Sequence, residues 1–322
     1  MRRREFIAGL GGVAALPFAA RAQAKPVIGF LRSSSRADAT YLVTALRLGL
    51  KEAGFVDGQN VTIEVRSADN DLERIRAMAI DLIRRPVTVF VGNLAPALAA
   101  KSASSTVPIV FVMGSDPVRD GLVPNLNHPG GNVTGVTFLA GTLGAKRLEL
   151  LRQFVPKADM IAMLVNPNAS NTEEERRNVL AAAQTLGQKL AVFDVSSPGD
   201  LEPAFAEAVR RQAGALLVGA GSFMVSNRER VVALAAQHAL PANYAWREAT
   251  EAGGLMSYGP SITAAYHQVG VYAGRILKGE KVGDLPVMQS SKFEFVLNLK
   301  TAKTLGLEFH PQLLGLADEV IE

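Results

Sequence analysis

Residues suited to nucleophilic or metal chemistry are scarce in this 322-residue chain, which contains no cysteine and four histidines. Without cysteine there is no thiol nucleophile, no disulfide and no cysteine-ligated metal. The histidines are far apart, and no two share the H-x-x-x-H spacing that helical zinc sites use. They are His128, His238, His267 and His310. The sequence therefore predicts neither a metal site nor a cofactor.

One serine lies in a glycine-rich segment that partly matches a catalytic motif. The segment is Gly219-Ala220-Gly221-Ser222-Phe223. A nucleophile elbow requires G-x-S-x-G, and Phe223 stands where the second glycine should be. The sequence thus predicts a protein that is not an enzyme. Catalytic triads need not be close in sequence, however, so an exported hydrolase or isomerase that uses Ser222 or Asp116 is the alternative.

Polar and aromatic residues directly follow several predicted strands. In open α/β sheets ligands bind at this edge, because helix N-termini and free backbone N–H groups converge there. The candidates in the first half of the chain are Ser33, Ser34, Gly92, Asn93, Leu94, Gly114, Ser115 and Asp116. Those in the second half are Asn166, Asn168, Asn171, Ser222, Phe223, Tyr244 and Trp246. We expect the two sets to face a common cleft, where a small solute binds.

The candidate residues also indicate the chemistry of the ligand. The helix entered through Asn93 has no acidic residue in its first turn, whereas the helix after Asn171 begins with three glutamates. A carboxylate is therefore expected on the first half of the chain, near Asn93. Phe223, Tyr244 and Trp246 favour an aromatic or hydrophobic solute. The alternatives are that Asn93 only caps its helix and that Trp246 only fills a core.

The elements that position these residues alternate between short β-branched runs and longer amphipathic runs. Strands are expected over 27–31, 61–65, 87–91, 109–112 and 133–138, with helices over 39–53, 71–84 and 94–103. After a loop rich in glycine, proline and asparagine, the alternation restarts with helices over 142–154, 173–186, 201–211 and 228–238 and strands over 161–165, 190–195 and 215–218. A strand over 255–258, a helix over 263–277, a strand over 293–297 and a short helix from 301 follow. This order predicts an α/β protein with two doubly wound parallel-sheet lobes.

The first 22 residues are typical of an export signal. A basic cluster precedes a largely apolar run from Phe6 to Ala20, and Ala20-Arg21-Ala22 matches an A-x-A cleavage site. Arg3-Arg4-Glu5-Phe6-Ile7 fits the twin-arginine pattern, and a general secretory leader is the alternative. We therefore expect the mature protein to function in the periplasm.

The charge outside this segment is balanced. The segment holds four of the 34 basic residues and one of the 30 acidic residues, which leaves 30 basic and 29 acidic residues. A near-neutral chain does not favour a nucleic-acid partner. No later stretch reaches the roughly 18 consecutive apolar residues that indicate a membrane helix.

Six longer motifs resemble one known family. They are HPGGNVTGVT (128–137), AKRLELL (145–151), VNP (165–167), GGLMSYG (253–259), GRILKGEK (274–281) and KFEFVLNLKTAK (292–303). Together they resemble the periplasmic substrate-binding proteins of ABC transporters, in the branch described as tryptophan/tyrosine or uncharacterised-substrate binding. The resemblance extends over residues 27–322.

The resemblance implies the type I periplasmic binding protein fold, in which three crossovers form a three-stranded hinge between two lobes. Here the crossovers would lie at 136–142, 255–258 and 287–292, so that 26–137 with 256–288 form the first lobe and 138–255 with 289–322 the second. It also implies a monomeric, non-enzymatic receptor that delivers its solute to an ABC permease; a periplasmic sensor subunit is the alternative. This chain has Gly221-Ser222-Phe223 where the family commonly has Asp-Pro-Phe. The partner of a ligand ammonium group is therefore left open.

Overall fold

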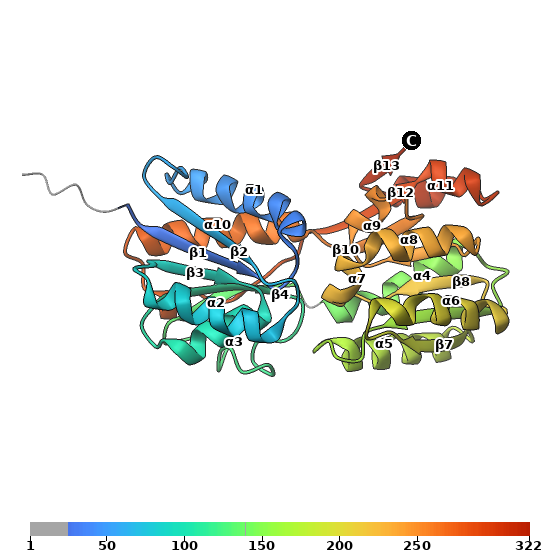
Figure 1. The fold of residues 1–322 in the computed structure, drawn as a ribbon. Coiled ribbons are helices and arrows are strands. Elements are labelled where there is room, and N and C mark those ends of the chain that lie inside the picture. Colours follow the sequence, from blue (N-terminus) through green and yellow to red (C-terminus); the bar gives the residue numbers. More distant parts are fainter. Residues whose placement is uncertain (1–24, 139) are drawn as a thin grey trace, which may run out of the picture.

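Two α/β lobes lie side by side in the computed structural model, which describes residues 25–138 and 140–322 (Figure 1). The expected export signal over residues 1–22 lies outside the described residues. Among the described helices, none combines the length and the apolar composition that crossing a membrane requires.

The first lobe is built on a wholly parallel six-stranded sheet with the order β11-β5-β4-β3-β1-β2. Its strands are β1 (Val27–Arg32), β2 (Thr62–Ser67), β3 (Val89–Gly92), β4 (Ile109–Met113), β5 (Val133–Thr137) and β11 (Met288–Gln289). Its helices are α1 (Arg36–Glu52), α2 (Leu72–Arg84), α3 (Leu94–Ala103) and α10 (Ile262–Leu277), with the 3-10 turn η3 (Val282–Asp284). Helices α1 and α10 cover one face of the sheet, and α2 and α3 cover the other. Because helices cover both faces of the sheet, β3, β4 and β5 are buried along their whole length.

The second lobe contains a seven-stranded sheet with the order β13-β12-β10-β9-β8-β6-β7. Its strands are β6 (Met160–Val165), β7 (Lys189–Asp194), β8 (Ala215–Val218), β9 (Ala242–Tyr244), β10 (Met256–Pro260), β12 (Phe293–Asn298) and β13 (Glu319–Ile321). Its helices are α4 (Gly144–Phe154), α5 (Thr172–Thr185), α6 (Leu201–Arg210), α7 (Ser222–Ser226), α8 (Arg228–Gln237), α9 (Arg247–Glu251), α11 (Leu299–Thr304) and α12 (Pro311–Leu316), with the 3-10 turns η1 (Ala140–Leu143) and η2 (Pro198–Asp200). All its strand pairs are parallel except β10 with β12.

The chain passes between the lobes after β5, after β10 and between β11 and β12. The expected second crossover at 255–258 is wrong, because residues 256–260 form β10 and pair with both β9 and β12. The segment that returns to the first lobe therefore begins with α10. Backbone hydrogen bonds join the crossing segments: the Ser290 N–H donates to the Thr137 carbonyl at 2.8 Å, and the Ser261 N–H donates to the Lys292 carbonyl at 2.9 Å.

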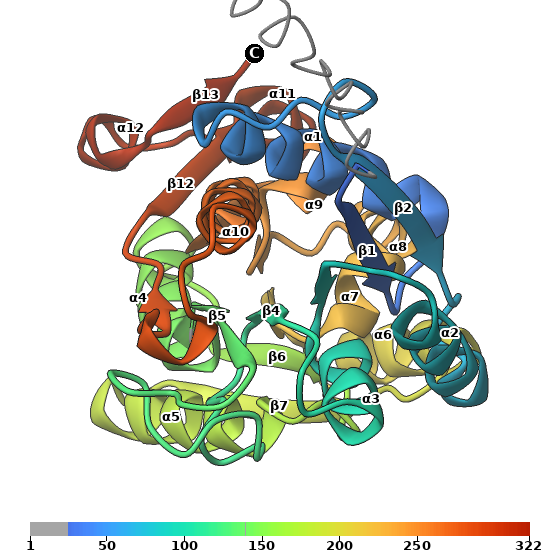
Figure 2. The same cartoon turned by 90° about the vertical axis from the view of Figure 1, so that its left-hand side faces the viewer.

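Helix α10 returns to lie beside α1, although the two are far apart in the sequence (Figure 2). Two glycines permit this close approach. A Cβ at Gly49 would lie 1.9 Å from the carbonyl oxygen of His267, and one at Gly270 would lie 2.2 Å from that of Leu46. Glycine within a helix costs about 1 kcal/mol relative to alanine, and the tight helix contact offsets this cost. The packing also buries Tyr266 of α10 against the end of β1.

Candidate functional site

A cavity of about 330 Å³ lies between the two lobes and is lined by residues of both. First-lobe residues reach it from the carboxyl ends of β1, β3 and β4, and second-lobe residues reach it after β6, β8 and β9. Its volume is at the lower end of the range for small-molecule sites, roughly 300 to 1,000 Å³. The arrangement brings the ligand-binding edges of two parallel sheets to one space.

The cavity brings together many of the candidates predicted from the sequence. Those that line it are Ser33, Asn93, Leu94, Gly114, Ser115, Asn168, Asn171, Ser222 and Trp246. Those that do not line it are Ser34, Gly92, Asp116, Asn166, Phe223 and Tyr244.

Local structure accounts for the polar candidates outside the lining. Asp116 and Asn166 each form a turn, because their Oδ1 atoms accept the backbone N–H two residues later, at 2.8 Å in both cases. The Ser34 hydroxyl accepts a hydrogen bond from Arg32 Nε at 3.3 Å. Gly92 lies directly against α3, since a Cβ there would be 2.8 Å from the Cβ of Pro96.

The two aromatic candidates outside the lining pack into the second lobe. Tyr244 is buried in the core beneath α8 and α9, and burial raises the pKa of its hydroxyl. Phe223 packs against the same core from α7. Of the predicted aromatic residues, only Trp246 is on the cavity wall.

Several residues that line the cavity, among them Asn70, Phe138 and Ser170, were not predicted from the sequence, and Arg32 is the charged one. It is the last residue of β1, is 7% exposed, and is the only charged residue among the described residues that line the cavity. Its Nη1 donates to the Tyr266 hydroxyl at 2.6 Å, and its guanidinium lies 5.6 Å from the centre of the Tyr266 ring. Among the ion pairs of the described residues, none includes Arg32. A nearly buried cation therefore faces the cavity without a carboxylate partner from the described protein.

The N-terminus of α3 lies beside Arg32. Asn93 occupies the N-cap position, but its side chain makes no hydrogen bond to its own helix. Its Oδ1 instead accepts the Ser33 N–H at 3.0 Å, and its Nδ2 donates to the Ser33 hydroxyl at 3.0 Å. The interpretation of Asn93 as only an N-cap is therefore wrong. The first turn of α3 has no acidic residue, so its N–H groups and positive dipole end favour an anion.

Trp246 forms the aromatic part of the opposite wall. Its side chain is 7% exposed, its Nε1 donates to the Ala220 carbonyl at 3.1 Å, and its ring meets Phe138 edge-on with ring centres 5.4 Å apart. Both Phe138 and Trp246 line the cavity. The indole is thus held in one orientation by a hydrogen bond and a packed neighbour.

A buried ion pair lies behind this wall. Arg147 of α4 is fully buried and Glu175 of α5 is 1% exposed, and their side chains are hydrogen-bonded. Burial raises the pKa of the Glu175 carboxyl, and the guanidinium of Arg147 opposes that rise. The second carboxylate oxygen of Glu175 accepts the Ala220 N–H at 3.0 Å. The pair therefore fixes Ala220, whose carbonyl in turn orients Trp246.

The two lobes also touch directly at one rim of the cavity. The Ser170 hydroxyl donates to the Ser115 hydroxyl at 3.0 Å. Arg119 of the first lobe pairs with Glu174 of the second at 3.0 Å and donates to the Ser170 carbonyl at 3.1 Å. Glu174 and Glu175 are thus both paired with arginines, so the first turn of α5 is less negative than its sequence suggested.

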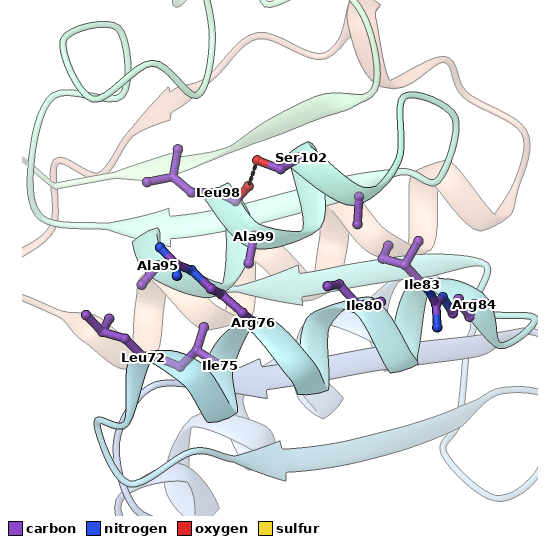
Figure 3. Close-up of a pocket in the computed structure, with 11 residues that line it drawn as sticks. Leu72, Ile75, Arg76, Ile80, Ile83, Arg84, Ala95, Leu98, Ala99 and Ser102 are labelled. Atoms are coloured by element: carbon purple, nitrogen blue, oxygen red, sulfur yellow. Dashed lines mark hydrogen bonds between the residues drawn. The ribbon is translucent and has the colours of Figure 1, made fainter.

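A second cavity, of about 580 Å³, lies on the outside of the first lobe between α2 and α3 (Figure 3). It is lined mainly by apolar side chains, and the Ser102 hydroxyl there donates to the Leu98 carbonyl of its own helix at 3.0 Å. This groove belongs to one lobe and contains no buried charged group. We therefore take the smaller interlobe cavity as the candidate site. Within the described part of the chain, no three His, Cys, Asp or Glu side chains are grouped as a metal site requires.

The chain is similar to known proteins in both sequence and structure. The profile of the family described as ABC transporter substrate binding protein matches residues 27–321. A tyrosine-binding protein of Clostridioides difficile (strain R20291) is 26% identical over 260 residues, which are 80% of this chain and 74% of that protein.

Two solved structures extend the comparison. The ABC domain of Streptococcus pneumoniae in complex with L-Trp gives a TM-score of 0.83 at 26% identity, covering 92% of this chain and 100% of that one. The ligand-free, open structure of a substrate-binding protein with adhesive properties from Clostridium difficile gives a TM-score of 0.69 at 25% identity, covering 92% of this chain and 99% of that one.

Proposed function

Because this chain belongs to the family of ABC transporter substrate-binding proteins, we propose that it is the periplasmic receptor of an ABC importer. It captures a small solute that carries a carboxylate and an aromatic or hydrophobic body, such as an aromatic amino acid or an analogue. The observation that carries this proposal is that Arg32 and Trp246 line the same interlobe cavity. The export pattern of residues 1–22 supports the periplasmic location.

The first lobe supplies the carboxylate subsite. Two guanidinium donors of Arg32 are taken by Tyr266 and Ser34, which fix its plane, while Nη2 makes no hydrogen bond to the described protein. A carboxylate at Nη2 would also meet the N-terminal end of α3 beside Asn93. Charge-assisted hydrogen bonds of this kind are stronger than neutral ones.

The second lobe supplies the indole of Trp246 for the apolar body, and Phe138, which directly follows β5 of the first lobe, packs against that indole. The two rings offer aromatic contact area at a small cost in side-chain entropy. The ligand carboxylate would then be bound by the first lobe, while its aromatic body would contact Trp246 of the second lobe. A ligand that contacts both lobes stabilises the arrangement in which they are close, and this is the requirement for ligand-driven hinge closure.

Two observations support closure as part of the function. The lobes touch at one rim of the cavity through Arg119, Glu174, Ser170 and Ser115, and these contacts would favour a closed arrangement. The chain also superimposes better on the L-Trp complex than on the ligand-free, open structure, at similar sequence identity. The closed form would then present both lobes to the permease.

Isothermal titration calorimetry with a panel of aromatic carboxylates and aromatic amino acids tests the proposal, followed by mass spectrometry of the recovered ligand. We expect binding of one molecule per chain and recovery of that molecule unchanged. Conversion of the ligand into a product would contradict a receptor function, and a folded protein that binds no member of the panel would contradict the proposed solute class.

A further inference from the structure

We infer that the natural ligand is an aromatic carboxylic acid without an α-ammonium group, rather than an amino acid. The inference rests on the proposed function and narrows its ligand class. It is based on the charged residues around the interlobe cavity. Among the described lining residues, Arg32 can bind a ligand carboxylate, and no carboxylate is present to bind a ligand ammonium group.

The described residues that line the cavity include one charged side chain, and its charge is positive. Among the described residues that line it, Arg32 is the only ionisable one, and the remaining polar groups are amides and hydroxyls, as in Asn93, Ser115, Asn168 and Ser222. A monocarboxylate would neutralise the site on binding. A zwitterionic amino acid would bring an additional cation into the same space without a carboxylate to receive it, and burial of an unpaired charge is strongly unfavourable.

The acidic residues behind the first-lobe rim are already engaged. Asp120 is hydrogen-bonded to the Ser115 hydroxyl through Oδ2, and its Oδ1 pairs with Arg119 at 3.2 Å. Asp116 lies outside the lining and accepts the Val118 N–H at 2.8 Å. Neither carboxylate is directed into the cavity.

The acidic residues closest to the second-lobe wall do not line the interlobe cavity either. Glu174 pairs with Arg119, and Glu175 pairs with the buried Arg147. Glu248 lines a separate small cavity behind Trp246, where burial raises its pKa and its Oε1 makes no hydrogen bond to the described protein. The second lobe therefore offers neutral groups to the part of the ligand that would carry the ammonium.

Gly221 is the position at which one added side chain would change this balance. It lines the cavity as the residue before α7, and its φ of −63° is accessible to any residue. A Cβ there would approach only the Cβ of Ala169, at 3.2 Å. With glycine at this position, none of the described residues that line the wall opposite Arg32 carries a negative charge. The two ligands named in the relatives, tyrosine and L-Trp, both carry an ammonium group, so the inference separates this chain from them.

The test compares pairs of ligands that differ only in the ammonium group. Calorimetric titrations at pH 7 use indole-3-propanoate against L-tryptophan and 3-phenylpropanoate against L-phenylalanine. The acid of each pair should bind at least about 10-fold more tightly, because a buried charge left without a partner costs more than an unsatisfied neutral group. Equal or tighter binding of the amino acids would overturn this inference and leave the receptor function intact. Binding of none of the four by folded protein would overturn the proposed function itself.

Two matched variants strengthen the test. Gly221→Asp places a carboxylate on the cavity wall and should shift the preference toward L-tryptophan by about 10-fold or more. Gly315→Asp adds the same charge at a position with open space around its Cβ and should leave the preference unchanged. If Gly221→Asp melts at a much lower temperature, Ser222→Asp on the same wall replaces it. An unchanged preference in a folded cavity variant would contradict the inference.

Discussion

Replacement of Arg32 by glutamine removes the only cation among the described residues that line the cavity, while keeping a side chain that can donate to Tyr266. At 4 Å and an effective dielectric constant of about 20, the attraction between guanidinium and carboxylate is about 4 kcal/mol. Desolvation of the carboxylate offsets part of this, and measured hydrogen bonds to charged groups contribute about 1.5 to 3 kcal/mol. We expect a loss of about 2 to 3 kcal/mol, or roughly 30- to 150-fold in Kd.

Calorimetry with indole-3-propanoate or L-tryptophan, whichever the unaltered protein binds more tightly, measures this loss. Arg32→Lys keeps the charge without the planar donor fork and should lose less affinity than Arg32→Gln. Arg74→Gln removes an exposed arginine that pairs with Asp69 and serves as the control for net charge. The neutral amide of the same ligand should bind Arg32→Gln and the unaltered protein alike. A loss below about threefold for the acid, or an equal loss for the amide, would refute the reasoning.

Four further predictions follow from the site and the export pattern. Asn93→Asp keeps an acceptor for the Ser33 N–H but adds a negative charge at the carboxylate subsite, so the affinity should fall by about 1 to 3 kcal/mol with little change in Tm; an unchanged Kd would argue against this subsite. Trp246→Ala should lose about 1 to 3 kcal/mol of affinity and also lower the Tm, whereas Trp246→Phe should keep most of the affinity; full affinity in the alanine variant would remove the indole from the site. Arg119→Ala removes an exposed ion pair between the lobes, so the ligand should dissociate faster and Kd should rise about 2- to 10-fold. Stopped-flow experiments measure the dissociation rate, and an unchanged rate would show that this pair does not hold the lobes together. Changing Arg3 and Arg4 together to lysine should stop export, whereas normal export would indicate the general secretory route.

Much of the fold was predictable because its strands are buried on both faces. Such strands give continuous apolar runs, as in 109–112. Helix α3 was predicted over its observed range because the segment is rich in alanine and leucine, which favour helix. The second crossover was misplaced because a short apolar run does not reveal which sheet it joins. Pairing of β10 with β12, a strand far along the chain, decides that question.

The position of the interlobe cavity could be predicted from the sequence, whereas the charges of its lining could not. The rule that ligands bind at the carboxyl ends of strands located Ser33, Asn93 and Trp246 without reference to tertiary structure. Arg32 directly follows the strand expected over 27–31 and was still missed, because its burial beside the cavity depends on Tyr266 from the distant α10. The sequence signal that could have found it is a charged residue closing a buried strand directly before a serine-rich loop.

The sequence also did not show which way each side chain points. Tyr244 was expected at the cavity, but successive residues of a strand point to opposite faces, and Tyr244 points into the second-lobe core while Asn243 contacts the Arg147 carbonyl on the other side. The buried pair of Arg147 with Glu175 was equally hidden, because three consecutive glutamates at a helix start indicate a solvated surface. Only the packing of α4 on α5 shows that one of them is buried.

Mass spectrometry of the small molecule released from natively purified protein tests the central claim most directly. The account predicts one molecule per chain, an aromatic monocarboxylic acid without an amino group, which rebinds unchanged to the protein and is absent from identically prepared Arg32→Gln. Release of a molecule that lacks a carboxylate, or equal retention by Arg32→Gln, would contradict it.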